Sequence, residues 1–568
     1  MNFTKNQLDI FDFVKSGKGH GIIDAVAGAG KTTTIIESAR YVPENTSILF
    51  CAFNKAIATE ISQRFQKKGM DRVQVKTIHA LGYQMLRHKF TGPREIQIKE
   101  NKYRQIIQDP ASDEALQPYF ERLLDLNNYP PFNELDDKRN FGAKRFIYNA
   151  KERLLSMVHK YRTTLMKDDA DSFRDMVLHY SIFSGREAKT PTFNPELKHY
   201  LECLRYYIQR GNEIADRSLL IDFADMLYLP YVWNLQPKEK FDFVFIDECQ
   251  DLSRSQIAIA LKYCLKTCRV LAVGDPRQSI YGFNGADIES FDKIKKQFEP
   301  MEPLSLTTSF RCPKSVIKLA TEIRPDITGS KTEEGIVRTI EIHKVAELAV
   351  PGDLIISRVK APLLILVFTF IDKDIKVRIH DDEADSFIEE LKKLFKQEQL
   401  QIRLSKHPGG FDQLKEDVIN RWTWIIEKEA EKIDDSTERN LHIITETAFL
   451  ERKVEFLHKK YVSWKSRCDS VLEILKVIKE YISFKDNPIT LSTIHRAKGL
   501  ENRRVFILNY DLMPYYRDGM QDWEWIQEVN LKYVALTRAL EELYLVKAEK
   551  MEELIDEGSL FDDYPLID

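Results

Sequence analysis

The stretch "AVAGAGKTTT" combines small residues, one lysine and a run of hydroxyl side chains. Gly28 and Gly30 allow the backbone to curl, so that its N–H groups point at a chain of phosphates. Lys31 would neutralise the β- and γ-phosphate oxygens, and the hydroxyl group of Thr32 would hold Mg²⁺. The spacing therefore predicts a phosphate-binding loop. The residues predicted to surround the phosphates are Ala27, Gly28, Ala29, Gly30, Lys31, Thr32 and Thr33.

A second stretch, "FDFVFIDECQDLS", places two acids directly after an apolar run. The run from Phe243 to Ile246 is typical of a buried parallel strand. Because α/β sheets bind ligands at the carboxyl ends of their strands, the acids that follow are candidates for chemistry. Asp247 is suited to bind Mg²⁺, and Glu248 is suited to orient and deprotonate an attacking water. Elsewhere such a pair usually forms a solvated turn, but beside a phosphate-binding loop we predict catalysis.

The elements around these stretches predict how they are positioned. An apolar run precedes Gly28, and a helical pattern begins near Lys31, which aims the positive end of a helix at the phosphates. Strands that alternate with helices along the chain predict α/β sheets with right-handed crossovers. The separation between Lys31 and Asp247 exceeds what one such layer needs, so we expect a mostly helical insertion over 91–215.

The composition is that of a globular protein, with 568 residues, 43% of them hydrophobic and 30% charged. This length suggests roughly three to four domains of about 150 residues. The N-terminus lacks the pattern of a secretion signal, and the apolar run Ala361–Ile371 is shorter than the ~20 residues that span a bilayer. We therefore expect a soluble, intracellular protein.

The cysteines number seven, without paired CxxC spacing, which favours reduced thiols over a disulfide framework or a zinc site. Two of them, Cys264 and Cys268, are expected on one helix. The net charge of −4 means that any nucleic acid must bind through local basic patches. The stretch 138–167 is such a patch, because it is rich in lysine and arginine with aromatic residues interleaved. On its own, however, it slightly favours a solvated helix face.

Eight motifs, in a fixed order, carry a resemblance to a known family. They are "AGAGKTTT", "AFNKAIATEI", "TIHALGY", "IDECQD", "GDPRQSIYGFNGA", "SFRCPKS", "TIHRAKGLE" and "YVALTRA". The series resembles that of superfamily 1A helicases, the UvrD/Rep/PcrA group, and its "FNKAIA" variant is most similar to the F-box DNA helicase branch. The resemblance extends from Gln7 to Arg538.

The resemblance implies an α/β fold with two RecA-like P-loop NTPase lobes, parallel sheets flanked by helices, each with an inserted mainly helical subdomain. It places lobe 1A at 1–90 and 216–300, subdomain 1B at 91–215, lobe 2A at 301–380 and 485–568, and a short subdomain 2B at 381–484. The basic patch 138–167 falls in subdomain 1B, which contacts DNA in the family. That context reverses our preference, and we expect the patch to bind DNA.

The resemblance also implies roles at an ATP site. Gln7 would recognise adenine, Phe310 would stack on it, and Glu501 would hold the ribose. Arg311 and Arg538 would reach the γ-phosphate from the second lobe and stabilise charge on the transferring phosphoryl group. Gln278 would sense the γ-phosphate and the attacking water. The cofactors implied are ATP and Mg²⁺.

A further set of residues resembles the family's DNA contacts. Tyr281 and Phe283 would face single-stranded DNA, so that a shift at Gln278 would move a base-stacking platform. Phe53 lies one place from a base-contacting position of the family, which leaves its stacking role open. The remaining candidates are Asn54, Thr77, His79, Thr493 and His495, although lone histidines are more often structural and His495 would serve equally to relay between the two sites.

The expected activity is ATP-dependent unwinding of duplex DNA by a motor that moves 3′→5′ on single-stranded DNA. Its expected partners are single-stranded DNA and single/double-strand junctions, with no membrane, in the cytoplasm or at the nucleoid, and the chain would be monomeric on its own. Two alternatives stay open. One is a translocase that removes bound proteins, and the other is a motor or regulatory subunit that works with a partner nuclease in repair or antiphage defence.

Overall fold

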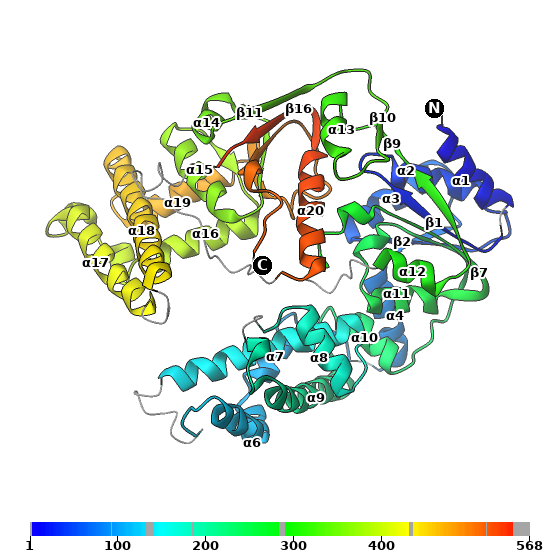
Figure 1. Cartoon of the computed structure of the whole chain (residues 1–568), viewed down its shortest axis with the longest axis horizontal. Coiled ribbons are helices and arrows are strands. Elements are labelled where there is room, and N and C mark those ends of the chain that lie inside the picture. Colours follow the sequence, from blue (N-terminus) through cyan, green and yellow to red (C-terminus); the bar gives the residue numbers. More distant parts are fainter. Residues whose placement is uncertain are drawn as a thin grey trace. The chain divides into compact units, whose positions relative to one another are not determined.

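The computed structural model describes residues 3–16, 18–92, 94–131, 141–183, 187–282, 290–430, 436–517 and 520–548. These residues fold as two compact units. The first unit contains the described residues of Met1–Phe310, Ile323–Ser330 and Pro514–Tyr533. The second contains those of Arg311–Glu322, Lys331–Met513 and Val534–Asp568. Figure 1 labels the elements of both units.

The first unit is built on a parallel sheet with the strand order β3-β2-β6-β7-β1-β8. Buried side chains fill both faces of its central strands, which is why apolar runs such as "ILFCA" and "FDFVFI" form them. Its strands are β1 (His20–Ala25), β2 (Ile48–Ala52), β3 (Val73–Thr77), β6 (Phe241–Ile246), β7 (Cys264–Gly274) and β8 (Met301–Leu306). Its helices are α1 (Lys5–Ser16), α2 (Lys31–Ser38), α3 (Lys55–Lys67), α4 (Ile78–Lys89), α10 (Asp225–Val232), α11 (Arg254–Lys262) and α12 (Ser290–Gln297). A short pair, β9 (Thr308–Ser309) and β10 (Thr328–Gly329), follows β8.

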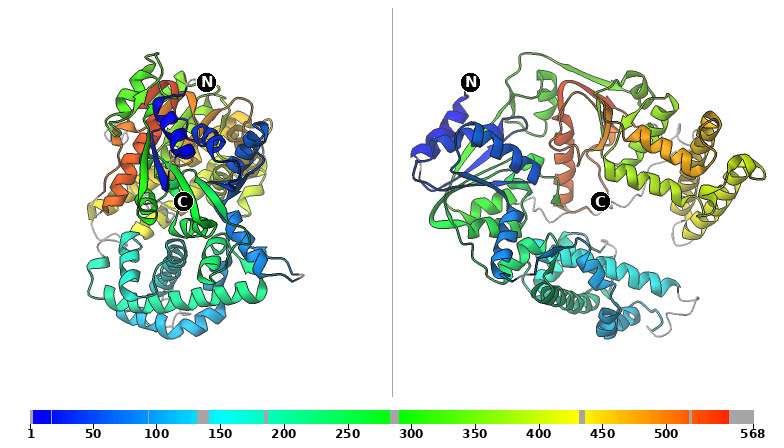
Figure 2. Two further views of the ribbon diagram at one scale, coloured as in Figure 1. Left: turned by 90° about the vertical axis from the view of Figure 1, so that its right-hand side faces the viewer. Right: turned by 180° about the vertical axis from the view of Figure 1, so that it is seen from behind.

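A helical insertion interrupts the first unit after α4. Its helices are α5 (Lys102–Ile107), α6 (Pro110–Leu126), α7 (Phe141–Thr164), α8 (Ala170–His179) and α9 (Phe193–Ser218). They pack around a core of their own, which includes Phe120, Leu154 and Tyr200, and Figure 2 shows them gathered in one group. The parallel pair β4 (Gln97–Ile98) and β5 (Leu220–Ile221) joins the two ends of the insertion.

A buried ionic network ties this insertion to α10. Lys102 Nζ lies 2.5 Å from Asp225 Oδ2, and Arg162 Nη1 lies 2.9 Å from Asp225 Oδ1 and 2.7 Å from Asp222 Oδ1. All four side chains are buried, and breaking such a network leaves an uncompensated charge inside the protein. The network therefore fixes α5 and α7 of the insertion against the start of α10.

The second unit contains another parallel sheet, with the strand order β11-β16-β15-β12-β14-β13. Its strands are β11 (Ile336–Ile340), β12 (Leu354–Ser357), β13 (Val377–Arg378), β14 (Ile489–Thr493), β15 (Asn502–Leu508) and β16 (Ala539–Val546). Helices α13 (Lys314–Ala320), α14 (Val345–Leu348) and α15 (Lys360–Asp372) accompany the sheet. The chain passes from the first unit into the second within α20 (Asp522–Leu536).

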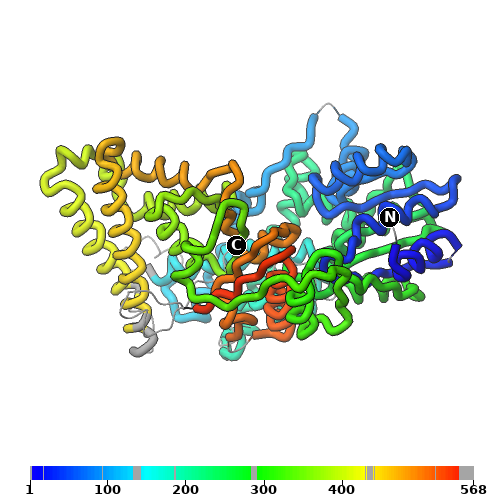
Figure 3. The backbone as a smooth tube through the Cα atoms, turned by 90° about the horizontal axis from the view of Figure 1, so that it is seen from above, coloured from blue at the N-terminus to red at the C-terminus, as the bar shows by residue number. Residues whose placement is uncertain are grey.

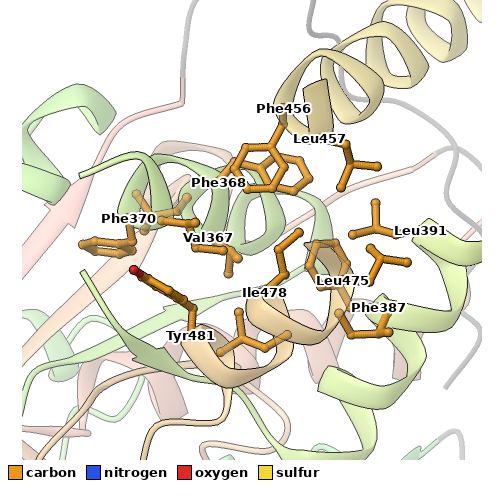
Figure 4. Close-up of a cluster of buried hydrophobic side chains, with 14 of the residues drawn as sticks. Val367, Phe368, Phe370, Phe387, Leu391, Phe456, Leu457, Leu475, Ile478 and Tyr481 are labelled. Carbon is orange, nitrogen blue, oxygen red and sulfur yellow. The ribbon is translucent and has the colours of Figure 1, made fainter. Parts of the chain in front are cut away.

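A second helical insertion lies between β13 and β14. It consists of α16 (Asp381–Lys393), α17 (Gly410–Ala430), α18 (Ser436–Trp464) and α19 (Val471–Ile482), and Figure 3 shows α17 and α18 side by side. One apolar core joins this insertion to α15. The rings of Phe368 on α15 and Phe456 on α18 have centroids 4.2 Å apart, with Leu475 and Ile478 of α19 in the same cluster (Figure 4).

The predicted mixed α/β class, with parallel sheets flanked by helices, is confirmed. The domain bounds that the resemblance implied stay predictions. One local expectation was wrong, because Cys264 and Cys268 lie on strand β7 and not on a helix. In the described part of the chain, none of the helices combines the length and the apolar character that crossing a membrane requires.

Candidate active site and DNA-facing surface

Three neighbouring strands of the first unit end at the same edge of their sheet. In the order β6-β7-β1, strand β1 leads into the phosphate-binding loop and β6 leads into Asp247 and Glu248. Strand β7, which lies between them, leads into Asp275. Because all three strands are parallel, their carboxyl ends bring these loops together.

The glycines of the loop adopt the conformation that the sequence predicted. Gly28 has φ 72° and Gly30 has φ 73°, both in the left-handed region that favours glycine. A Cβ atom on Gly30 would meet nothing within 4 Å, so its backbone conformation and not its surroundings calls for glycine. Helix α2 begins at Lys31, as predicted, and its N-terminus lies at the loop. Within the loop, the side chains of Ala27 and Ala29 are buried, whereas Thr33 in the first turn of α2 is exposed.

Lys31 faces the acids at the end of β6. Its Nζ lies 3.2 Å from Glu248 Oε2. Burial acts to lower the pKa of Lys31, but the charges of Glu248, Asp275 and Asp247 hold it above its ordinary value. The ammonium group is therefore held in place, and held charged, by carboxylates. A phosphate arriving here would find a cation already positioned.

Asp247 and Thr32 offer a pair of oxygen ligands. Thr32 Oγ1 lies 3.4 Å from Asp247 Oδ2. Burial, and then the charge of Glu248, raise the pKa of Asp247 to about 7, whereas the charge of Lys31 acts to lower it. Hard oxygen donors of this kind suit Mg²⁺, which is commonly held by a few protein oxygens together with phosphates. The residues present fit that ion.

Glu248 has an unusual backbone conformation, and a hydrogen bond holds its side chain in place. Its φ of 49° lies in the left-handed region, an uncommon conformation for glutamate that clusters at functional sites. Gln250 Nε2 donates to Glu248 Oε2 at 2.6 Å, and Gln250 Oε1 accepts from the backbone N–H of Asp275 at 3.1 Å. Gln278 Nε2 in turn donates to Asp275 Oδ2 at 2.7 Å. The chain of contacts thus runs from Glu248 to Gln278.

Two members of this chain, Gln250 and Asp275, were missing from the predicted site. Each stands inside a quoted motif, "IDECQD" and "GDPRQS", so a signal was present. Burial raises the pKa of Asp275, which lies completely inside the protein. Its carboxylate is therefore a further negative neighbour of Lys31.

The two residues predicted to bind adenine both lie in the first unit, next to the loop. Gln7 is buried, and its Nε2 donates to Thr34 Oγ1 on α2 at 2.9 Å while its Oε1 accepts from the backbone N–H of Thr4. The backbone N–H of Phe310 donates to Gly28 O at 2.9 Å. The Phe310 ring is 45% exposed, which leaves a face for stacking.

Two candidate DNA contacts form a ring pair. Phe53 follows β2 and Tyr281 follows the turn that carries Gln278, and their ring centroids lie 6.5 Å apart with an interplanar angle of 18°. Both rings are half-buried, so each retains an accessible edge or face. Phe283 lies outside the described residues.

Two other residues of the first unit that were predicted to contact DNA act as helix caps. Asn54 accepts from the backbone N–H of Ile57 at 2.9 Å, which caps α3, and Thr77 accepts from Ala80 at 3.2 Å, which caps α4. His79 lies in the first turn of α4, where burial lowers its pKa. Asn54 and Thr77 therefore have a structural role as helix caps, and the DNA contacts of all three residues stay predictions.

The remaining site residues gather in the second unit. Arg311 Nε lies 2.6 Å from Glu501 Oε2, and Arg311 Nη1 donates to the carbonyl of Thr537 at 3.2 Å. Arg538 is only 1% exposed, and its guanidinium donates to the carbonyls of Val534 and Leu500. Arg311, Glu501 and Arg538 therefore share one neighbourhood. The pairing of Arg311 with Glu501 did not follow from the predicted roles of either.

Thr493 and His495 also lie in the second unit, at the end of β14, and both are buried. Thr493 Oγ1 accepts from the backbone N–H of Arg496 at a long 3.5 Å. Their burial indicates that side-chain contact with a nucleic acid would need some rearrangement. Their DNA roles stay predictions.

A glycine loop, an acidic pair and parallel strands in this arrangement define a P-loop nucleotide-binding protein with RecA-like units. Residues 7–299 match the model of the UvrD/REP helicase N-terminal domain, and residues 488–546 match that of the UvrD-like helicase C-terminal domain. The chain belongs to the UvrD/REP helicase family. The resemblance drawn from the eight motifs is thereby confirmed.

Individual relatives are similar over most of the chain. The ATP-dependent DNA helicase PcrA of Staphylococcus aureus (strain Mu50) is 24% identical, over 96% of this chain and 84% of its own length. The protein of the same name from Bacillus subtilis is 22% identical, over 97% of this chain and 84% of its own length. DNA helicase II of Haemophilus influenzae is 26% identical, over 54% of this chain and 38% of its own length.

Proposed function

We propose that this chain is an ATP-dependent DNA helicase that moves 3′→5′ along single-stranded DNA and separates duplex ahead of it. One observation carries the proposal. Gln278 donates to Asp275, a buried acid next to the phosphate-binding loop, and Tyr281, a few residues further on, stacks beside Phe53. The same short loop thus connects the proposed ATP site to an aromatic surface of the kind that binds bases. The relatives' printed name, ATP-dependent DNA helicase, supports the activity, and the resemblance carried by the eight motifs implies the polarity.

The residues of the first unit are suited to ATP hydrolysis. Glu248 would orient the attacking water and accept its proton, while Lys31 holds the phosphate oxygens. Thr32 and Asp247 would hold Mg²⁺, which supplies charge neutralisation on the phosphates when bound. Gln7 and Phe310 would contact adenine, and Glu501 the ribose. Arg311 and Arg538 would stabilise the charge on the transferring phosphoryl group.

The ring pair gives the first prediction. Replacing Phe53 by alanine is expected to weaken binding of a thymidine oligonucleotide roughly 5- to 150-fold, because one stacked base contributes about 1–3 kcal/mol. Basal ATP hydrolysis without DNA should stay close to that of the wild type, since the Phe53 ring pairs with Tyr281 and Phe53 has no proposed role at the phosphates. Fluorescence anisotropy with a labelled oligonucleotide measures the affinity.

Trp424→Ala is the matched control, because Trp424 is a strongly exposed aromatic residue on α17 in the second unit. Its loss should leave oligonucleotide binding unchanged. An affinity of Phe53→Ala equal to that of the wild type would remove Phe53 from the proposed track.

Direction is tested with partial duplexes that carry a single-stranded overhang on one end. We expect unwinding that requires ATP and Mg²⁺ and that is faster with a 3′ overhang than with a 5′ overhang. The measurement is strand separation, followed by the loss of energy transfer between dyes on the two strands. Equal or faster unwinding from 5′ overhangs would contradict the proposed polarity.

The same substrates separate the two alternatives from the proposal. Displacement of streptavidin from a biotinylated single strand, without strand separation on any overhang, would favour a translocase that removes bound proteins. DNA-stimulated hydrolysis without either activity, together with a nuclease that copurifies with the chain, would favour a motor subunit of a larger assembly.

A further inference from the structure

A bulge near the start of β7 places two cysteines next to each other. Phe241 of β6 pairs with Cys264, and Phe243 pairs with Arg269, so two residue steps on β6 are matched by five on β7. The three additional residues of β7 form an exposed bulge. Cys268, which precedes Arg269, therefore falls beside Cys264 in the register of the sheet, although the two cysteines are four residues apart in the sequence.

The side chains of the two cysteines face each other. A hydrogen bond joins them, in which the Cys268 thiol donates to the Cys264 sulfur. This bond, burial and the charges of Cys264 and Asp242 raise the pKa of Cys268, which agrees with a position opposite Asp242 on β6. Two sulfur atoms in hydrogen-bond contact are near enough for a disulfide to form after small rotations of the side chains.

The cysteines of this chain differ in how accessible and how acidic they are. All seven lie within the described residues, and only Cys264 is half-buried, whereas the other six are buried. The hydrogen bond from Cys268, and then the charge of Lys240, lower the pKa of Cys264, although burial acts to raise it. Because the thiolate is the reactive form, an oxidant in solution should attack Cys264 first. Burial raises the pKa of four other thiols, those of Cys51, Cys203, Cys249 and Cys468.

We propose that Cys264 and Cys268 form a site of reversible oxidation, at which a peroxide converts the two thiols into an intramolecular disulfide. Cys264 is the attacking cysteine, because it is accessible from solution. Cys268 is the resolving cysteine, because it is only 6% exposed and lies beside Cys264. This site goes beyond the proposed function and does not depend on it.

The reaction takes place in two steps. The Cys264 thiolate attacks one oxygen of the peroxide, which breaks the O–O bond, forms a sulfenic acid on Cys264 and releases hydroxide. The Cys268 sulfur then attacks the Cys264 sulfur, and the S–O bond breaks as the thiol proton leaves with the hydroxyl group as water. The proton that Cys264 lost when it ionised neutralises the hydroxide. With hydrogen peroxide, two thiols are thus oxidised to one disulfide by two electrons, and one peroxide is reduced to two waters.

The resolving cysteine should protect Cys264 from irreversible damage. A sulfenic acid without a neighbouring thiol is oxidised further, to sulfinic and sulfonic acids that ordinary thiols do not reduce. A disulfide, in contrast, returns to two thiols by exchange with a reductant. The bulge lies at the amino end of β7, whereas Asp275 follows the carboxyl end of that strand. The disulfide should therefore form without loss of ATP hydrolysis.

Peptide mapping tests the site directly. Trypsin cleaves after Lys262, Lys266 and Arg269, so each cysteine of the pair falls in its own peptide, 263–266 or 267–269. The full chain is treated with hydrogen peroxide, its remaining thiols are blocked with N-ethylmaleimide, and the tryptic digest is analysed by mass spectrometry. We expect the two peptides to be joined after peroxide treatment, and to separate when dithiothreitol is added before blocking.

Serine variants test the roles of the two cysteines. In Cys268→Ser, Cys264 should form a sulfenic acid that dimedone traps, and excess peroxide should convert it to the sulfinic acid. In Cys264→Ser, Cys268 should stay reduced, because it is buried and has lost its partner. Cys468→Ala is the control, since Cys468 is a buried cysteine of the second unit, and it should form the joined peptides as the wild type does.

Absence of the joined peptides from peroxide-treated wild type would overturn the inference, and this result requires no variant to fold. Oxidation of Cys268 in Cys264→Ser as fast as in the wild type would overturn the assignment of Cys264 as the attacking cysteine. The proposed function is tested apart from this site, because the hydrolysis-deficient variant Glu248→Gln should form the same disulfide as the wild type. Failure of the proposed helicase activity would leave the peptide map unchanged.

Discussion

Replacing Glu248 by glutamine is expected to lower kcat for ATP hydrolysis by about 10²–10⁴-fold, while ATP binding stays nearly intact. Glutamine preserves the size of the side chain, but its amide cannot accept a proton from water. The carboxylate is held 3.2 Å from Lys31 Nζ and 2.6 Å from Gln250 Nε2, so it is already placed at the phosphate-binding loop. Steady-state hydrolysis at saturating single-stranded DNA gives kcat, and titration with a fluorescent ATP analogue gives the affinity.

Glu239→Gln is the matched control for this prediction. Glu239 is an exposed carboxylate that precedes the same strand, β6, and accepts a hydrogen bond from Gln74. The same chemical change there should leave kcat unaltered. Hydrolysis by Glu248→Gln at the wild-type rate would refute the assignment of Glu248 as the general base.

The phosphate site was predictable from sequence because its parts obey local rules. Gly28 and Gly30 require a left-handed backbone that only glycine adopts freely, and an apolar run before Asp247 indicates a buried strand. Parallel strands place the loops that follow them at one edge, so two distant motifs are expected to meet. The expectation that the two motifs meet did not require the order of the strands in the sheet, which the sequence alone does not predict.

The links between these parts depend on tertiary packing and were not predictable. Gln250 reaches Asp275 because β7 lies beside β6, and the bond between Ala27 and Tyr533 joins segments from opposite ends of the chain. Cys264 shows the same limit on a smaller scale. Its spacing from Cys268 suggested a helix, but Cys264 pairs with Phe241 of β6, and the segment forms the first part of strand β7.

Predictions of DNA contact were the least secure because a local structural role competes with them. Asn54 and Thr77 each precede a helix and accept a hydrogen bond from its first turn, which is the ordinary reason for such residues at that position. A side chain that caps a helix and one that binds a phosphate have the same polar character. The partial exposure of Phe53 and Tyr281, and not the pairing of their rings, distinguishes these residues from a packed core.

Replacing Arg311 by alanine is expected to lower kcat by roughly 10³–10⁵-fold, the range associated with arginines that stabilise a transferring phosphoryl group. ATP affinity should change much less, because the interaction strengthens as charge develops in the transition state. Arg311 is held by Glu501 and by the carbonyl of Thr537, so its guanidinium already has a defined position within the second unit. Single-turnover hydrolysis, with enzyme in excess over ATP, measures the chemical step separately from product release.

Arg503→Ala supplies the control, since Arg503 lies in the same unit and its side chain is 77% exposed, with its only described ion pair made to Glu541 at the surface. The rate should be unaffected there. Arg311→Lys should recover only part of the loss, because lysine restores the charge without the planar fork that binds two oxygens at once. Hydrolysis by Arg311→Ala within a few-fold of the wild-type rate would contradict the proposal that Arg311 stabilises the transferring phosphoryl group.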